Sequence, residues 1–206
     1  MKNVMKSIQR MSVLLLAILF LPACSDSDTE DVVVALDQVE IDDLKFLREE
    51  EKLARDVYLY SYDKYNLNVF SNISNSEQTH MDKVLSLLTK YGIADPASTE
   101  RGVFNNAVLQ DLYDQLTQKA DSSLVDALTV GAIIEDLDIS DIDDFFVNTT
   151  KSDLLEMYSN LLCGSRNHMR SYSSQLTANG ATYQVQFITE EEYATIMNQA
   201  NEKCGK

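Results

Sequence analysis

Four long stretches of this chain repeat apolar residues at alternating steps of three and four, the spacing that lines one face of an α-helix. They cover residues 42–65, 69–91, 122–139 and 152–178. Gly92 and Gly180 follow the second and fourth stretches and predict where those helices end. Ser122 or Ser123 predicts a cap for the third helix, and Ser152 one for the fourth. Because no segment keeps the alternation typical of a strand, the sequence predicts an all-α fold.

The connections predict how these helices are joined. Residues 93–120 separate the second helix from the third; they begin with the turn-forming run 95–98 and contain a short helix near 107–119. Residues 141–146 are expected to form a separate helical turn. After the fourth helix, residues 183–188 are expected to be extended, and a capping box at 189–192 predicts a last short helix that reaches about Ala200. The expected architecture is therefore a four-helix bundle with a long crossover between helices two and three and short accessory helices.

Each of the four helical faces is apolar except near its middle. The polar residues there are Glu51 in the first helix, Glu77 and His80 in the second, Glu135 and Asp138 in the third, and Ser165 and His168 in the fourth. Each ionised carboxylate in an apolar interior costs several kcal/mol unless it is compensated, and acids that meet in one layer also repel one another. Because a divalent cation removes both costs, we expect a metal site in the middle of the bundle. Protonated, hydrogen-bonded carboxyls are the alternative, since they would also remove both costs.

Simpler roles for the acids are open from the sequence alone. Glu51 could be part of an acidic run, Glu49-Glu50-Glu51, on a solvated face, where Glu49 and Glu50 are expected to lie. Glu135 could be a helix-end acid, and Asp138 could cap the turn expected at 141–146. Glu77 and His80 could form a hydrogen-bonded pair on the surface, since residues three apart share a helix face.

The remaining candidates also have structural alternatives. His168 could be a core histidine bonded to an asparagine or a tyrosine. Four tyrosines near the same layer, Tyr58, Tyr62, Tyr158 and Tyr172, are expected to pack in the core with their hydroxyls bonded to the layer's carboxylates.

The first residues have the pattern of an export signal. Lys2, Lys6 and Arg10 precede an apolar run at 11–21 that is too short for a comfortable membrane span. The run ends in Leu21-Pro22-Ala23-Cys24, which resembles the processing box of a bacterial lipoprotein. We therefore expect a lipoprotein signal peptide at 1–23, a lipid on Cys24, an acidic tether at 24–41 and a bundle domain at 42–206. The alternative is an ordinary secretory signal with a coincidental cysteine.

The charge of the chain excludes some classes of partner. The 206 residues carry a formal net charge of −16. The expected leader holds three of the 17 basic residues and none of the 33 acids, so 14 basic residues face 33 acids in the mature chain, a net charge of −19. This balance argues against nucleic acid and against binding to anionic lipid surfaces. It is compatible with gathering cations, but an acidic surface also serves solubility alone.

Two cysteines remain after Cys24. Outside the cytoplasm a pair of cysteines can form a disulfide, and Cys163 and Cys204 could join the end of the chain to the fourth helix. A free, buried Cys163 is the alternative.

Several motifs resemble those of a known superfamily. Glu51-x-x-Ala54-x-x-x-Tyr58 is similar to the first-helix motif of rubrerythrins, and Glu77-x-x-His80 to their second-helix motif. With the crossover, Glu135 and His168, the chain resembles the ferritin-like superfamily. The closer resemblance is to a bacterial ferritin-like family of unassigned function, which shows runs like 48–58, 76–81, 102–104 and 165–168. The similarity covers about residues 43–198.

The resemblance implies a site for two metal ions. Glu51 and His80 would hold one ion, Glu135 and His168 the other, and Glu77 would bridge them. Ser165 departs from the pattern, since rubrerythrins place a second bridging glutamate there; Asp138 or water would fill its place. Iron is the expected metal, with manganese or zinc as alternatives, because imidazole and carboxylate suit all three.

These observations lead to competing hypotheses about function. The first is a lipid-anchored protein of the bacterial cell envelope that faces either the periplasm or the surface. It would bind metal ions and act as a di-iron redox protein with dioxygen or peroxide. The second is a non-enzymatic bundle for metal sequestration or envelope interaction, in which the polar layer fixes helix register. Iron storage is a third, which lipid anchoring disfavours. A homo-oligomer is compatible with the sequence, which identifies no protein partner.

Overall fold

The computed structural model describes residues 35–205 of the chain. The expected signal peptide, Cys24 and most of the expected tether lie outside these residues. Six helices follow one another: α1 (Gln38–Tyr65), α2 (Asn68–Lys90), α3 (Ala107–Ala120), α4 (Leu124–Phe146), α5 (Ser152–Ala178) and α6 (Glu190–Asn198). Since residues 35–205 contain no strand, the predicted all-α class is confirmed.

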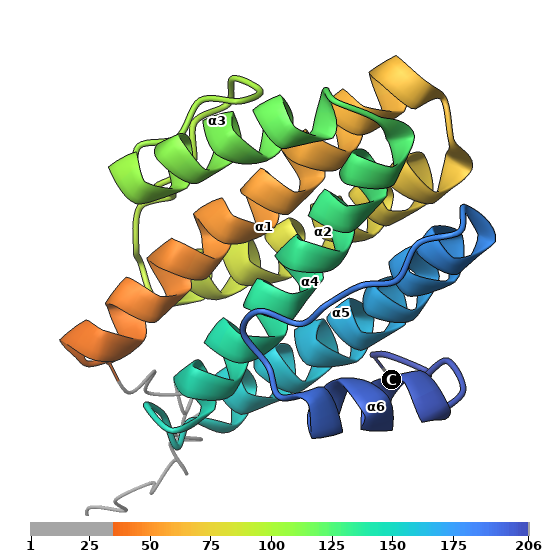
Figure 1. Ribbon diagram of the computed structural model, residues 1–206. Helices are drawn as coiled ribbons and strands as arrows, with labels where there is room; N and C mark the ends of the chain where they lie inside the picture. The colour runs from red at the N-terminus through yellow and green to blue at the C-terminus, as the bar shows by residue number, and fades with distance from the viewer. Residues whose placement is uncertain (1–34, 206) are drawn as a thin grey trace, which may run out of the picture. The chain divides into compact units, whose positions relative to one another are not determined.

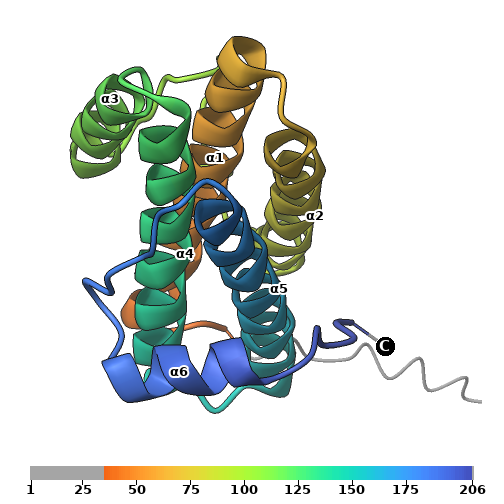
Figure 2. The same cartoon turned by 45° about the vertical axis from the view of Figure 1, so that its right-hand side comes forward.

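The four long helices form a bundle. α1 packs against α2, α4 packs against α5, and the two pairs meet through α1 with α4 and α2 with α5 (Figures 1 and 2). The helices face one another with the apolar residues that the sequence pattern selected: Leu44, Leu47, Phe70, Val84, Leu128, Ile142, Leu154 and Leu161 are almost fully buried. The hydrophobic core therefore lies along the axis of the bundle, as the spacing predicted.

The long crossover between α2 and α4 is present, and α3 forms most of it. α3 lies against α1 and α4 on the outside of the bundle and runs back along its length (Figure 1). As a result, α4 starts near the end of the bundle where α2 started. The crossover thus lets α4 pack beside α1, which brings Glu135 to the level of Glu51.

Two helix boundaries differ from the sequence prediction. α1 begins at Gln38, inside the expected tether, because Asp37 and Glu40 form a capping box with each other's backbone N–H groups. α4 continues without a break to Phe146, so the separate turn expected at 141–146 is wrong. Ile142 and Phe145 extend the buried face of α4, and this packing favours one helix over two.

A buried ion pair holds the crossover to α1. The Lys52 ammonium lies 2.6 Å from the Asp56 carboxylate, and both side chains are fully buried. The ammonium also donates to the carbonyl oxygens of Glu100 (2.9 Å) and Val103 (3.1 Å), while Asp56 accepts the N–H of Gly102 at 2.9 Å. The charges are therefore paired and hydrogen-bonded, the condition under which a buried pair is tolerated.

The expectation that Glu49 and Glu50 face solvent is wrong. Their exposed fractions are 4% and 2%. The crossover covers Glu49, while Glu50 lies close to Asp138 and Asp141 of α4. Glu49 accepts the backbone N–H groups of Asn105 (2.7 Å) and Asn106 (3.3 Å), so its carboxylate fixes the start of α3. Glu50 is buried without such a partner among residues 35–205.

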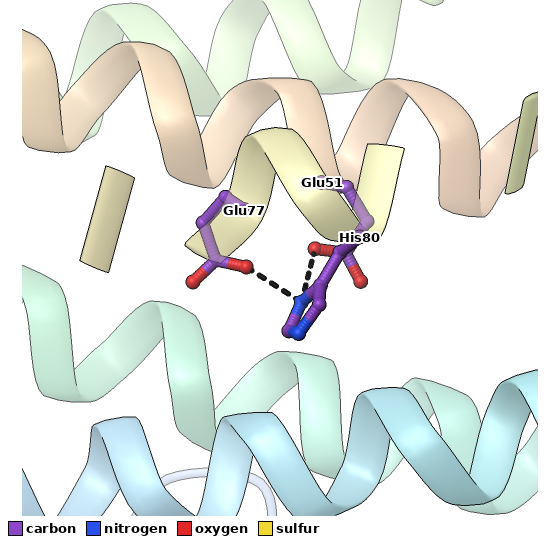
Figure 3. Close-up of side chains that lie close together, drawn as sticks. All are labelled: Glu51, Glu77 and His80. Carbon is purple, nitrogen blue, oxygen red and sulfur yellow. Dashed lines mark hydrogen bonds and ion pairs between the residues drawn. The ribbon is translucent and has the colours of Figure 1, made fainter. Parts of the chain in front are cut away.

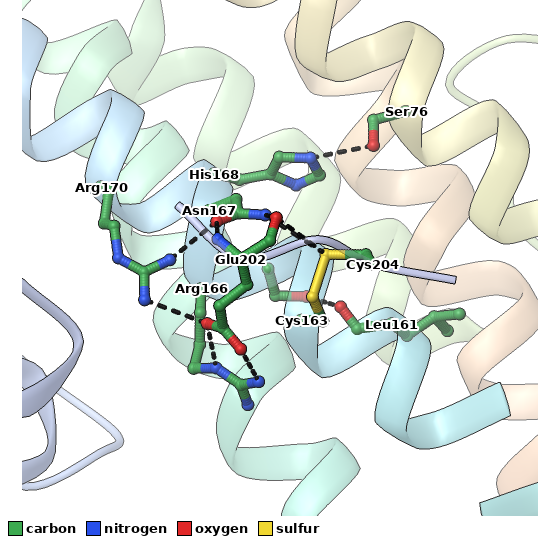
Figure 4. Close-up of a disulfide and its surroundings, with 10 residues drawn as sticks. Ser76, Leu161, Cys163, Arg166, Asn167, His168, Arg170, Glu202 and Cys204 are labelled. Atoms are coloured by element: carbon green, nitrogen blue, oxygen red, sulfur yellow. Dashed lines mark hydrogen bonds and ion pairs between the residues drawn. A yellow bond between two sulfur atoms is a disulfide. The ribbon is translucent and has the colours of Figure 1, made fainter. Parts of the chain in front are cut away.

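A buried carboxylate and a disulfide help to attach the chain beyond α5 to the bundle. The buried Asp136 on α4 accepts the Tyr183 hydroxyl (2.6 Å) and three backbone N–H groups from the segment 186–188. Further along, a disulfide joins Cys163 to Cys204, with their Cα atoms 5.6 Å apart (Figure 4). The end of the chain is thus fixed along the outside of α5, close to His168.

Candidate metal centre

The polar residues of the four helical faces meet in one layer in the middle of the bundle. The layer contains Glu51 from α1, Glu77 and His80 from α2, Glu135 and Asp138 from α4, and Ser165 and His168 from α5; each is at most 7% exposed. The surface roles that the sequence left open for Glu51, Glu77 and Glu135 do not hold, because these side chains point into the interior. Apolar side chains cover the layer above and below, which shields its charges from water.

One cluster of this layer joins α1 and α2. The Nδ1 atom of His80 lies 2.8 Å from Glu77 Oε2 and 3.2 Å from Glu51 Oε2 (Figure 3). The three-residue step between Glu77 and His80 puts both on the inner face of α2. Ligand atoms from these three residues all lie within 4.8 Å of one another, so they could hold one metal ion.

A second cluster reaches across to α4 and α5. The Nδ1 atom of His168 lies 2.9 Å from Glu77 Oε1 and 3.4 Å from Glu135 Oε2. Ligand atoms of Glu77, Glu135 and His168 again lie within 4.8 Å of one another. Glu77 belongs to both clusters and offers one oxygen to each imidazole, the position of a group that bridges two ions.

Neighbouring groups orient the two imidazoles. His168 Nε2 lies 2.9 Å from the hydroxyl of Ser76, which directs Nδ1 toward Glu77. The apolar spacing did not identify Ser76, although its position one residue before Glu77 places it on the adjacent side of α2. The two rings are stacked, with centroids 5.6 Å apart.

Gly164 lets the His80 imidazole approach the backbone of α5. A Cβ atom at this position would lie 2.6 Å from Cε1 and Nε2 of His80, closer than real contacts allow. Gly164 thus creates the space that the ring occupies.

Tyr58 supports the second cluster through its hydroxyl, which donates to Glu135 Oε1 at 2.5 Å. This matches the role expected for the tyrosines. The buried hydroxyls of Tyr158 and Tyr172 differ, because neither has a hydrogen-bond partner within the described part of the chain. Tyr62 is only half-buried.

Asp138 and Ser165 lie beside the clusters and belong to neither. The Ser165 hydroxyl donates a short hydrogen bond to Asp138 Oδ2 and lies 3.0 Å from the Leu161 carbonyl. Because Asp138 sits inside the continuous α4, it does not cap a turn. Its carboxyl contacts the hydroxyl of Ser165 at the edge of the layer.

The electrostatics of the layer show why it suits a cation. Burial raises the pKa of Glu51 to about 7, against the opposing effect of His80. Burial lowers the pKa of His168, but the carboxylates of Glu77 and Glu135 outweigh it and raise that pKa to about 10. Without metal, both imidazoles therefore carry protons at neutral pH and act as the cations of the layer.

The donors of the layer fit a transition metal. Glu51 Oε1, Glu77 Oε1 and His168 Nδ1 are buried, and none has a well-aligned hydrogen bond to any group in residues 35–205. Two imidazoles and three carboxylates suit iron, manganese and zinc alike, so the residues do not select among these metals.

Fold and site together define an all-α bundle protein with a buried carboxylate and histidine layer that could hold metal. A family model described as an uncharacterized protein domain (DUF2202) matches residues 40–200, and the chain belongs to this family. The uncharacterized protein MJ0754 of Methanocaldococcus jannaschii is 50% identical over 158 residues, which are 76% of this chain and 85% of that protein.

A crystal structure of the same archaeal protein, described as hypothetical, has a similar fold. It superimposes with a TM-score of 0.81 at 47% identity and covers 82% of this chain and 98% of the other. Neither the description of the family nor that of the archaeal protein assigns an activity.

Proposed function

We propose that this protein binds two transition-metal ions, iron in the first place, in the layer between α1, α2, α4 and α5. The observation that carries the proposal is the position of Glu77, whose two carboxylate oxygens face two different imidazoles at 2.8 and 2.9 Å. A carboxylate with a purely structural role needs only one imidazole as its partner. A carboxylate between two nitrogen donors, each with a further acid, has the arrangement of a bridging ligand.

The residues would hold the two ions in the way that the resemblance implies. Glu51 and His80 would hold one ion, Glu135 and His168 the other, and Glu77 both. The ions would supply electron transfer to dioxygen or peroxide, the redox chemistry proposed for this site. Tyr58 holds Glu135 in place, and the apolar faces above and below the layer exclude water from it.

A non-enzymatic bundle is the second candidate, and the metal-free geometry favours it in one respect. The protonated imidazoles pair with Glu51, Glu77 and Glu135, so the layer is partly compensated without any ion. Such a network could fix the register of the helices by itself. The two candidates differ in whether the purified protein contains metal.

Elemental analysis of the protein from residue 24 onward separates them. We expect close to two metal ions per chain in the wild type. Glu77→Ala should lose both ions because it removes the shared ligand, while His80→Ala should lose at least the ion held with Glu51. Asn75→Ala, an exposed change on the same helix, is the matched control. A folded wild type that takes up no iron, manganese or zinc would leave the register-fixing bundle as the function.

We also propose that the protein is anchored in the cell envelope by a lipid on Cys24. The sequence pattern at residues 21–24 supports this proposal, as does the disulfide, because such bonds persist outside the cytoplasm. Among residues 35–205, every helix is too short or too polar to span a membrane.

A further inference from the structure

Glu50 stands out in the charged run of α1. Between Arg48 and Asp56, the other charged side chains all have partners in the described structure: Arg48 pairs with Asp95, Glu49 with backbone N–H groups, Glu51 with His80, Lys52 with Asp56, and Arg55 with Asp56 and Gln78. Glu50 is 2% exposed, and its carboxyl oxygens have no well-aligned hydrogen bond within residues 35–205. The side chain close enough to share a proton with it is another acid, Asp141, and no basic group in this part of the chain neutralises the pair. A buried, unsatisfied carboxyl costs stability, so its presence needs another reason.

A second buried carboxyl with an unpaired oxygen, that of Asp138, lies next to the metal centre. Asp138 accepts a hydrogen bond from Ser165 with one oxygen, while its buried Oδ1 has no partner in the described part of the chain. Burial and the charge of Asp138 both raise the pKa of Glu50. Burial and then the charges of Glu51 and Glu135 raise the pKa of Asp138. Asp138 is therefore a neighbour of Glu50 and also of the ligands Glu51 and Glu135, and it lies one helical turn from Glu135 on α4.

On the outer side, the acids continue to the surface. Glu135, Asp138 and Asp141 follow one another at three-residue steps on α4, each about 4.5 Å further along the axis. Asp141 is half-buried, is close enough to Glu50 to affect its pKa, and lines a surface pocket of about 640 Å³. Asp42, Asp43 and Asp144 also line this pocket, and its one basic residue is Lys45. An acidic hollow of this kind raises the local concentration of cations.

We propose that Glu50 and Asp138 form a transit position through which a divalent cation passes from the pocket at Asp141 to the metal centre. Within residues 35–205, groups of three ligands close enough to hold an ion occur only in the two clusters that share Glu77. Glu50 and Asp138 thus offer oxygens to a passing ion without the ligand count that would retain it. The inference rests on the proposed function, because a transit position needs a destination.

The test is the rate at which the metal-free protein, from residue 24 onward, takes up cobalt(II). This ion is a coloured substitute for iron(II), and its uptake can be followed by stopped-flow absorbance. Glu50→Gln removes the charge and keeps the shape, so loading should slow by about tenfold or more while the final number of bound ions stays that of the wild type. Glu156→Gln removes an equal charge from an exposed site on α5 and should load at the wild-type rate.

A stability measurement separates transit from a structural role. Glu50→Leu in the metal-free protein should melt at or above the wild-type temperature, because it removes an unsatisfied buried carboxyl, and it should load as slowly as Glu50→Gln. Wild-type loading by Glu50→Gln, or a lower melting temperature or failure to fold for Glu50→Leu, would overturn the transit position and leave the metal centre intact. A wild type that binds no cobalt would overturn both proposals.

Discussion

Glu77 shows how much of the site rests on single residues. Each of its two oxygens faces one imidazole, and the chain contains only two histidines. The spacing of Glu77 and His80 identified both residues from the sequence, because a three-residue step on an apolar helical face has few structural uses. Ser76 and Gly164 could not be found in the same way. Their roles depend on where α5 approaches α2, and the periodicity of a helix does not fix that distance.

The contact at Gly164 leads to a prediction at this scale. Gly164→Ala would place a Cβ atom 2.6 Å from the His80 ring, so the imidazole must move away from Glu51 and Glu77. We expect the affinity for metal to fall by about 10–100-fold, the usual effect of disturbing the support of a ligand. Alanine should favour the helix itself by about 1 kcal/mol, so helix destabilisation would not explain the loss.

Isothermal titration of the wild type and of Gly164→Ala with cobalt(II) measures this change in affinity. Ser174→Ala, on the exposed side of α5, is the control and should keep the wild-type affinity. An unchanged affinity in Gly164→Ala would mean that the ring has room to shift without leaving its carboxylates.

At the scale of helices and segments, the sequence predicted the bundle well and its surroundings less well. The apolar spacing located all four long helices and the buried face of each, because burial of a continuous stripe is what stabilises a helix in a bundle. It failed for Glu49 and Glu50, since their charge alone suggested solvent, whereas the crossover covers Glu49 and α4 lies beside Glu50. The turn expected at 141–146 failed for a related reason: tertiary packing of Ile142 and Phe145 outweighed the acids around them.

The segment after α6 gives a prediction about pH. Glu202 pairs with Arg166 (2.6 Å) and Arg170 (3.0 Å) on α5, beside the disulfide (Figure 4). The hydrogen bond from Arg166 lowers the pKa of Glu202 to about 2, although burial opposes it. Because the pKa is lower in the folded state than the usual 4.5, the carboxylate stabilises the fold above pH 4.5. This contribution is lost as the pH falls from 4.5 toward 2.

Glu202→Gln tests this in the metal-free protein by calorimetry. The variant should melt below the wild type at pH 6, and the difference should shrink at pH 3. Asp114→Asn, on the outer side of α3, should show no such pH-dependent difference. Equal melting temperatures for Glu202→Gln and the wild type at pH 6 would contradict a stabilising role for these ion pairs.

At the scale of the whole molecule, the predicted lipid on Cys24 would determine where the bundle acts. Mass spectrometry of the wild type purified from membranes should show a chain that starts at residue 24 and carries acyl groups on Cys24. Cys24→Ala should lack this mass and the cleavage before residue 24, because the lipid is attached to the thiol. A mature chain without acyl groups that begins elsewhere would support an ordinary secretory signal instead.

The ligands of the proposed centre are spread over most of the chain, from Glu51 on α1 to His168 on α5. A nascent chain that has not yet released α5 lacks His168, so neither the second cluster nor the full bundle around Glu77 can exist during synthesis. If the centre binds metal as proposed, the ions would enter after the last long helix has packed. The compartment in which the chain completes folding, rather than the one in which it is made, would then decide which ion the protein receives.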